Sequence, residues 1–190
     1  MLSVEQKNAN ELKFMELLFK LNIDLTELNK LLDSVDYFNK PASTQYFRAY
    51  PGGLCEHALS VAYELGALAN AYFPGRYTEE DIIKVAFFKD FYKATMYEVY
   101  AKNVKDEESG NWKTVPAYRT KESCMRPVYG DIGVSSYMQL RHIITFTDEQ
   151  LEAILHSRSD FTPDIHDVMR RFPLVQLTKM ADGVATYFNA

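Results

Sequence analysis

An almost unbroken apolar run, "IIKVAFFKDFYKATMY" at positions 82–97, constrains this chain more than any other segment. It follows Thr78 and three acidic residues, which are the cap and the first-turn charges that favour a helix start. A helix this apolar has to be buried, so the rest of the chain must surround it. The run nevertheless contains Lys89, Asp90 and Lys93. Buried charges are costly unless they are paired or bind a metal, so these residues are candidates for a functional site.

The segments around this run predict a mostly α-helical fold. Residues 8–22 place Leu12, Met15, Leu18 and Phe19 on one helical face. Asp24 can cap a second helix. Capping residues and helix-ending glycines and prolines divide much of the remaining chain into further helical segments. Further helices are predicted over residues 25–35, 54–73, 79–97, 146–158, 163–172 and 173–188.

One segment, residues 97–119, has a different pattern. Aromatic and β-branched residues alternate on both sides of the polar turn "KDEESGN", which predicts a β-hairpin. The expected architecture is therefore one domain over residues 1–190, with N-terminal helices in 1–36 and a hairpin inserted into a helical bundle.

Composition excludes several classes of protein. An apolar fraction of 47% is typical of a globular chain rather than a disordered one. The net charge of −5 argues against general nucleic-acid binding, which needs clustered cations. Two cysteines without CxxC spacing do not form a disulfide framework, and no signal-like or membrane-spanning run is present. These features lead us to expect a soluble cytoplasmic protein.

Three segments combine polar residues with apolar helical surroundings: "PASTQYFRAYPGGLCEHALSV", "FFKDFYKATMY" and "MADGVATY". In order and local context they resemble the metal-binding segments of the HD-domain metal-dependent phosphohydrolases, small phage and bacterial members in particular. The resemblance extends from about residue 41 to residue 187 and includes the hairpin. It implies an HD-domain helical bundle in which His57, Asp90 and Asp182 would hold a divalent metal ion. Asp90, Lys93 and His156 would be catalytic if the protein is active.

The sequence departs from the family pattern at the metal site itself. Lys89 stands where the family has the histidine of a histidine–aspartate pair, and Phe47 and Tyr129 stand where relatives often carry further histidines. An ammonium group has no lone pair for a metal, but it can neutralise two neighbouring carboxylates. We therefore expect Lys89 to substitute for the missing cation. The alternative is that Lys89 extends to the surface and contacts nothing in the pocket.

A pocket of this kind can bind phosphorylated ligands without cleaving them. The candidate contacts are cations for phosphate and aromatic rings for a base, namely Lys89, Lys93, Arg48, Arg119, Tyr46 and Tyr97, with Tyr50 and Tyr118 as further stacking candidates. The expected function is binding, or sequestration, of a nucleotide or other phosphorylated small molecule with little or no hydrolysis and no required cofactor. By the resemblance to phage proteins, it would act in a host cytoplasm.

Two other functions stay open. The first is an active hydrolase that uses a weak Mg²⁺ or Mn²⁺ site formed by His57, Asp90 and Asp182, with assistance from His156. The second is an interaction module that binds a protein partner or a second copy of itself, with Trp112 in the hairpin as a contact. Nucleophilic serine or cysteine catalysis has no support, because Cys55 and His57 lie two positions apart on a helix and point in different directions.

Overall fold

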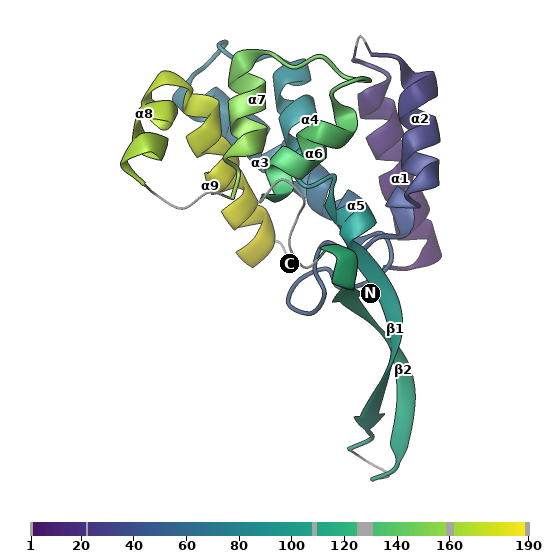
Figure 1. Cartoon of the computed structure of the whole chain (residues 1–190). Coiled ribbons are helices and arrows are strands. Elements are labelled where there is room, and N and C mark those ends of the chain that lie inside the picture. Colours follow the sequence, from purple (N-terminus) through teal and green to yellow (C-terminus); the bar gives the residue numbers. More distant parts are fainter. Residues whose placement is uncertain (1, 22, 108–109, 125–130, 159–161, 189–190) are drawn as a thin grey trace.

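The structure, a computed structural model, describes residues 2–21, 23–107, 110–124, 131–158 and 162–188. Within these residues it is mostly helical with a small antiparallel hairpin, which confirms the expected fold class at that level. Membership of the HD superfamily stays a prediction. The α-helices and strands, shown in Figure 1, are α1 Val4–Leu18, α2 Leu25–Ser34, α3 Gly53–Tyr72, α4 Glu79–Phe88, α5 Lys93–Met96, β1 Tyr97–Lys105, β2 Trp112–Thr120, α6 Ile132–Leu140, α7 Asp148–Leu155, α8 Pro163–Arg171 and α9 Pro173–Tyr187. Short 3₁₀ turns cover Tyr37–Asn39 and Glu122–Cys124.

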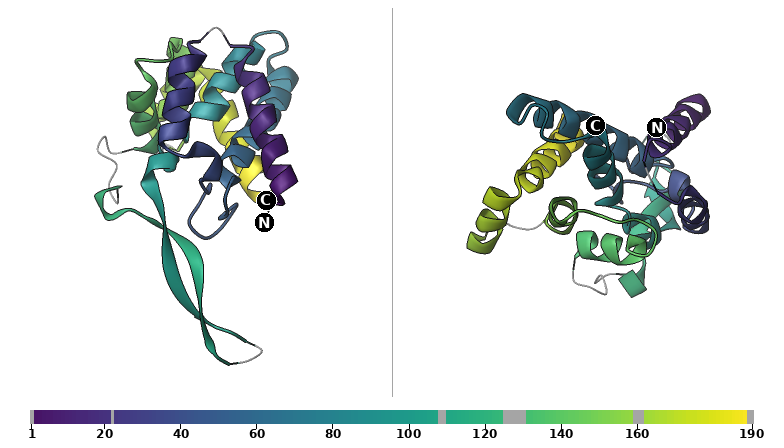
Figure 2. Two further views of the ribbon diagram at one scale, coloured as in Figure 1. Left: turned by 90° about the vertical axis from the view of Figure 1, so that its right-hand side faces the viewer. Right: turned by 90° about the horizontal axis from the view of Figure 1, so that it is seen from above.

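Helix α4 lies at the centre of the bundle, as its composition predicts. Every residue from Ile82 to Phe88 is buried, and α3 packs along it while α9 packs against α3. Figure 2, in the view from above, shows helices on several sides of α4. Phe14 of α1 stacks on Phe87 at a ring-centroid distance of 4.0 Å, so the N-terminal helices contribute to the same hydrophobic core.

The predicted apolar face of the first helix is partly wrong. Leu12 and Phe19 are largely exposed, whereas Phe14 and Leu18 are fully buried. The buried residues are four positions apart and therefore lie on one side of the helix. The helical period of apolar residues predicted a face that includes Leu12 and Phe19, but the face that packs against the core contains Phe14 and Leu18, and Phe14 stacks on Phe87.

The helix starts predicted from capping residues are confirmed. Asp24 accepts hydrogen bonds from the N–H groups of Thr26 and Glu27, and Thr78 and Thr147 each form a complete capping box. These signals depend on side chains within three residues of the helix end, so the sequence is sufficient to locate them.

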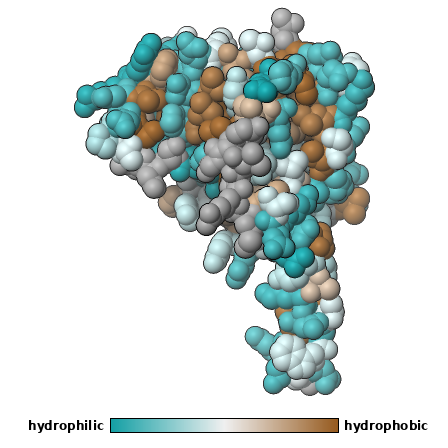
Figure 3. All heavy atoms as spheres, in the orientation of Figure 1, coloured by the Kyte–Doolittle hydropathy of each residue, from teal (hydrophilic) through white to brown (hydrophobic). Residues whose placement is uncertain are grey.

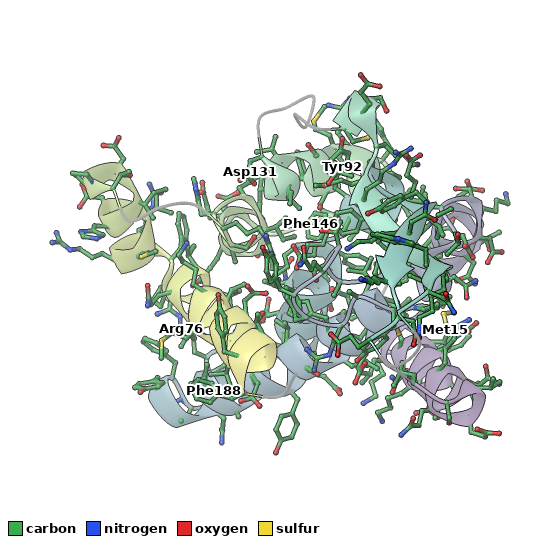
Figure 4. All side chains as sticks on the ribbon, turned by 90° about the horizontal axis from the view of Figure 1, so that it is seen from below. Met15, Arg76, Tyr92, Asp131, Phe146 and Phe188 are labelled. Carbon is green, nitrogen blue, oxygen red and sulfur yellow. The ribbon has the colours of Figure 1, made fainter. Side chains whose placement is uncertain are left out.

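The long helix predicted over residues 79–97 is interrupted in the structure. Helix α4 ends at Phe88 and α5 begins only at Lys93, with Lys89–Tyr92 forming turns between them. Ser136 of α6 spans this break: its Oγ accepts from the N–H of Tyr92 at 2.9 Å and donates to the carbonyl of Lys89 at 3.2 Å. Figure 4 shows Tyr92 beside α6. The interruption redirects the chain at the lysine–aspartate pair.

The hairpin occupies Tyr97–Thr120 and projects away from the helices as a long twisted ribbon (Figure 1). Its two strands pair in one continuous register, with Tyr97 opposite Thr120 and Lys105 opposite Trp112. No helix within the described ranges is both long and apolar enough to cross a membrane.

Candidate functional site

Three helical segments bring the predicted metal ligands together. His57 lies near the start of α3, Asp90 follows α4, and Asp182 lies in α9. Their ligand-type atoms all lie within 4.8 Å of one another. The packing of α3 against both α4 and α9 creates this convergence, because each segment then presents one polar residue to a common point.

Lys89 points into this cluster. Its Nζ donates hydrogen bonds to Asp90 Oδ2 at 2.6 Å and to Asp182 Oδ1 at 2.5 Å, and its side chain is 0% exposed. His57 Nε2 lies 3.0 Å from the same Asp182 oxygen and 3.5 Å from the same Asp90 oxygen. The structure therefore excludes the alternative in which Lys89 reaches the surface.

Two further cations contact Asp90. Lys93 Nζ lies 3.0 Å from Asp90 Oδ2 as an ion pair, and Arg158 Nε donates to Asp90 Oδ1 at 3.1 Å. Three cationic side chains thus surround two carboxylates. Arg158 was not among the predicted site residues. It is the last residue of the helix predicted over residues 146–158, but α7 ends at Leu155, and only the tertiary contact shows the role of Arg158.

The electrostatics keep the cluster ionised. Burial favours the neutral form of Asp90, but Lys89, Lys93 and Arg158 outweigh it and hold the pKa of Asp90 well below its usual range. The pKa of Asp182 is lowered mainly by Lys89, again against burial. Burial alone would lower the pKa of Lys89, but Asp182 and Asp90 raise it. For Lys93 burial is the largest effect, and its pKa falls to about 8.

The donor set does not fit a divalent ion while Lys89 keeps this position. Mg²⁺ binds oxygen at about 2.0–2.1 Å, and one oxygen of each aspartate already accepts a hydrogen bond from the Lys89 ammonium, at 2.6 Å and 2.5 Å. A metal would also lie beside a fixed positive charge. His57, Asp90 and Asp182 are close enough to be a metal triad, but the amine takes the central position.

The remaining predicted contacts are dispersed. Arg48 is buried, and its guanidinium donates to the carbonyl of Ala185 at 2.7 Å and to Ser60 Oγ at 3.0 Å, so it ties its loop to α9 and α3 rather than pointing at a ligand. Arg119 lies on the hairpin, where it pairs with Glu98 at 2.8 Å.

The predicted tyrosines and His156 also have separate positions. Tyr46 is 90% exposed, whereas Tyr97 is buried and its pKa is raised by burial and by the nearby Asp90. His156 ends α7 and lies 3.1 Å from Glu152, outside the cluster of potential metal ligands among the described residues. Tyr129 falls outside the described residues.

Phe47 closes one side of the cluster. Its ring lies 5.2 Å from the His57 ring and 5.6 Å from the Lys93 ammonium. It also lines a pocket of about 510 Å³ that reaches the cluster through Asp182. Other residues on the pocket wall include Arg158, Lys179, Gln176, Thr186 and Tyr187. The pocket thus joins the buried charges to an opening whose wall carries Arg158 of the cluster and one further cationic side chain, Lys179.

Comparison of the chain with protein-family models, with curated proteins and with solved structures found no significant match.

Proposed function

We propose that this chain is a degenerate HD-domain protein that binds a phosphorylated small molecule, with a nucleotide as the preferred class, and hydrolyses it little or not at all. The observation that carries the proposal is the Lys89 ammonium between Asp90 and Asp182. It supplies the charge that a metal would supply to the two carboxylates. The ammonium cannot bind a water molecule as a ligand. It therefore cannot lower the pKa of that water, which is how a bound metal generates a nucleophile.

The charges around the pocket favour an anionic ligand. The positive charges of the cluster outnumber its negative charges by one, since Lys89, Lys93 and Arg158 surround two aspartates. Lys179 adds another positive charge on the pocket wall. Only the Nε of Arg158 donates to Asp90, and a guanidinium has further N–H groups that suit a phosphate. Arg158 is 34% exposed, so a ligand in the pocket can reach it.

The aromatic side chains support a nucleotide among the phosphorylated ligands. Phe47 and Tyr187 both line the pocket, and Tyr187 is 82% exposed. An exposed ring beside a cationic wall can stack on a base while the phosphate binds to the cations. Stacking is tolerant of base identity, so the pocket is expected to select for the phosphate first.

The test is calorimetric titration with inorganic phosphate, pyrophosphate and a panel of mono-, di-, tri- and cyclic nucleotides. We expect at least one nucleotide to bind with micromolar affinity or tighter. Arg158→Ala should weaken that binding about tenfold or more, because a charged hydrogen bond is lost. Arg119→Ala, which removes a hairpin cation outside the pocket, is the matched control and should leave the affinity unchanged. Absence of binding throughout the panel would exclude the proposal.

The second candidate function is metal-dependent hydrolysis, and the convergence of His57, Asp90 and Asp182 favours it. Elemental analysis after purification without chelators, followed by turnover assays with added Mg²⁺ or Mn²⁺, distinguishes it from the first. We expect no stoichiometric metal and no turnover in the native chain. Lys89→His should gain metal affinity, because it restores a lone pair where the amine lies. Bound metal together with turnover in the native chain would favour the hydrolase.

A further inference from the structure

The hairpin has the geometry of an incomplete sheet. Figures 1 and 2 show it extending away from the helices, and no third strand pairs with β1 or β2 among the described residues. Val99 and Trp112 are 62% and 72% exposed. A two-stranded ribbon is marginally stable alone in water, and its edges offer unpaired N–H and C=O groups to another strand.

The hydrogen-bond alternation identifies which groups face outward on β1. The N–H of Lys121 donates to the carbonyl of Met96 at one end of the ladder, and that of Asp106 donates to Asn111 at the other. Hydrogen-bonded and non-hydrogen-bonded pairs alternate along an antiparallel ladder. In the observed register the even-numbered residues of β1 therefore bond to β2. The odd-numbered residues 97, 99, 101, 103 and 105 direct their N–H and C=O groups away from it.

The free edge of β2 is interrupted. Pro116 lies opposite Ala101, which is a non-hydrogen-bonded pair, so the nitrogen of residue 116 faces outward. Proline has no N–H to donate there. The outer edge of β2 thus lacks a donor near its middle, whereas the edge of β1 is continuous over its nine residues. Of the two strands, β1 alone offers an unbroken edge.

We infer that the β1 edge pairs antiparallel with the β1 edge of a second copy of this chain and forms a four-stranded sheet about a two-fold axis. The strand sequence is self-complementary when Tyr100 faces Tyr100 of the second copy. Glu98 then faces Lys102 of the second copy, and the symmetric pair repeats this contact. Val99 and Ala101 provide the outward hydrogen-bonding groups in the same register.

The charge pattern favours a second copy over an unrelated strand. Opposite charges directly across a ladder stabilise pairing, and like charges destabilise it. Figure 3 shows mainly hydrophilic side chains on the visible face of the ribbon, so charge and register rather than a large apolar patch would select the partner. Antiparallel pairing also points the two helical bodies in opposite directions. This inference is independent of the ligand proposed for the pocket.

The test uses two charge variants, Glu98→Lys and Lys102→Glu, separately and mixed. The first variant alone opposes two lysines at each contact between copies and also removes the Glu98–Arg119 pair within its own hairpin. The second variant alone opposes two glutamates at each contact. Each should therefore dissociate at least about tenfold more readily than the native dimer. Mixed in equal amounts, they oppose unlike charges at both contacts and should form a one-to-one heterodimer. Light scattering measures the masses, and native mass spectrometry with one variant labelled with ¹⁵N identifies the mixed species.

Proline variants test the edge itself. Ala101→Pro removes an outward N–H from β1 and leaves the hairpin bonds intact, so it should give a monomer. Thr114→Pro removes an outward N–H from β2 and should leave the dimer in place. A native chain that is monomeric at all accessible concentrations overturns the inference. So does a dimer that persists in Ala101→Pro, a larger assembly, or a pair of charge variants that fails to combine.

Discussion

At the residue scale, one side chain changes what the site can do. Lys89 Nζ makes the contacts with Asp90 and Asp182 that a bound cation would make. The lysine side chain is fully buried. A histidine in its place would give a metal ligand, whereas the lysine gives a fixed positive charge. The site becomes an ion-pair network in which the protein provides both signs of charge.

This network predicts loss of stability in acid. The folded-state pKa values of Asp90 and Asp182 lie below the usual value of about 3.9, so the folded state binds fewer protons than the unfolded state. Their contribution is complete above about pH 4 and is lost as the pH falls from there through the folded pKa values. Urea unfolding measured between neutral pH and strongly acidic pH should show this decrease.

A matched pair of variants isolates the contribution of the site. Asp182→Asn should be less stable than the native chain at pH 7, and the difference should shrink as the pH falls. Asp33→Asn, which changes an exposed carboxylate of α2, should follow the native profile. Parallel profiles for the native chain and Asp182→Asn would contradict the lowered pKa of Asp182.

At the element scale, the break between α4 and α5 positions the site. Asp90 lies in the turns between the helices and Lys93 is the first residue of α5, and their side chains, three positions apart, form an ion pair within the cluster. Ser136 satisfies the backbone groups on each side of the break. The interruption is thus stabilised by hydrogen bonds within the turns, such as that from the N–H of Lys93 to the carbonyl of Asp90 at 3.0 Å, and by Ser136 of another helix.

We predict that Ser136→Ala destabilises the protein by about 1–3 kcal/mol, because it leaves the buried N–H of Tyr92 without its acceptor. Ser135 is the control: it is also buried in α6, and its Oγ has no hydrogen-bond partner among the described residues. Ser135→Ala should be neutral or stabilising. The urea unfolding midpoints of the two variants test this prediction. Equal midpoints would mean that the Ser136 hydroxyl does not stabilise the break between α4 and α5.

At the scale of the whole molecule, the helical body and the projecting ribbon are separable in structure. The core joins residues of α1, α2, α3, α4 and α9, whereas most side chains of the ribbon are exposed or only partly buried. Tyr97 at its base is the exception, since it is buried near Asp90. The proposed ligand binding by the body and the proposed pairing through the ribbon are therefore expected to be independent.

Shortening the ribbon tests this separation. Replacing residues 101–116 with a two-residue Asn-Gly turn should leave the unfolding midpoint of the body close to that of the native chain, because these residues lie outside the core. Nucleotide affinity should be retained and dimerisation lost. A large fall in the midpoint would show that the ribbon contributes to the stability of the body.

The sequence alone determined the features that depend on neighbouring residues. Helix caps at Asp24, Thr78 and Thr147 and the alternation of the hairpin act over a few positions, so they could be predicted. The resemblance to the HD family, which puts Lys89 at the position of a metal-ligating histidine, together with the chemistry of a cation between carboxylates, also predicts the inward placement of Lys89. Membership of the HD superfamily and the bound ligand stay predictions.

Only the tertiary structure decided which distant groups meet. Arg158 and Asp90 are 68 residues apart, and no local pattern marks an arginine that will pair with a buried carboxylate. Arg48 could not be recognised as a structural anchor, because its contact with α9 is to the backbone carbonyl of Ala185, and backbone acceptors carry no sequence signature. Helix packing brings such groups together, and its geometry depends on the whole core rather than on any one segment.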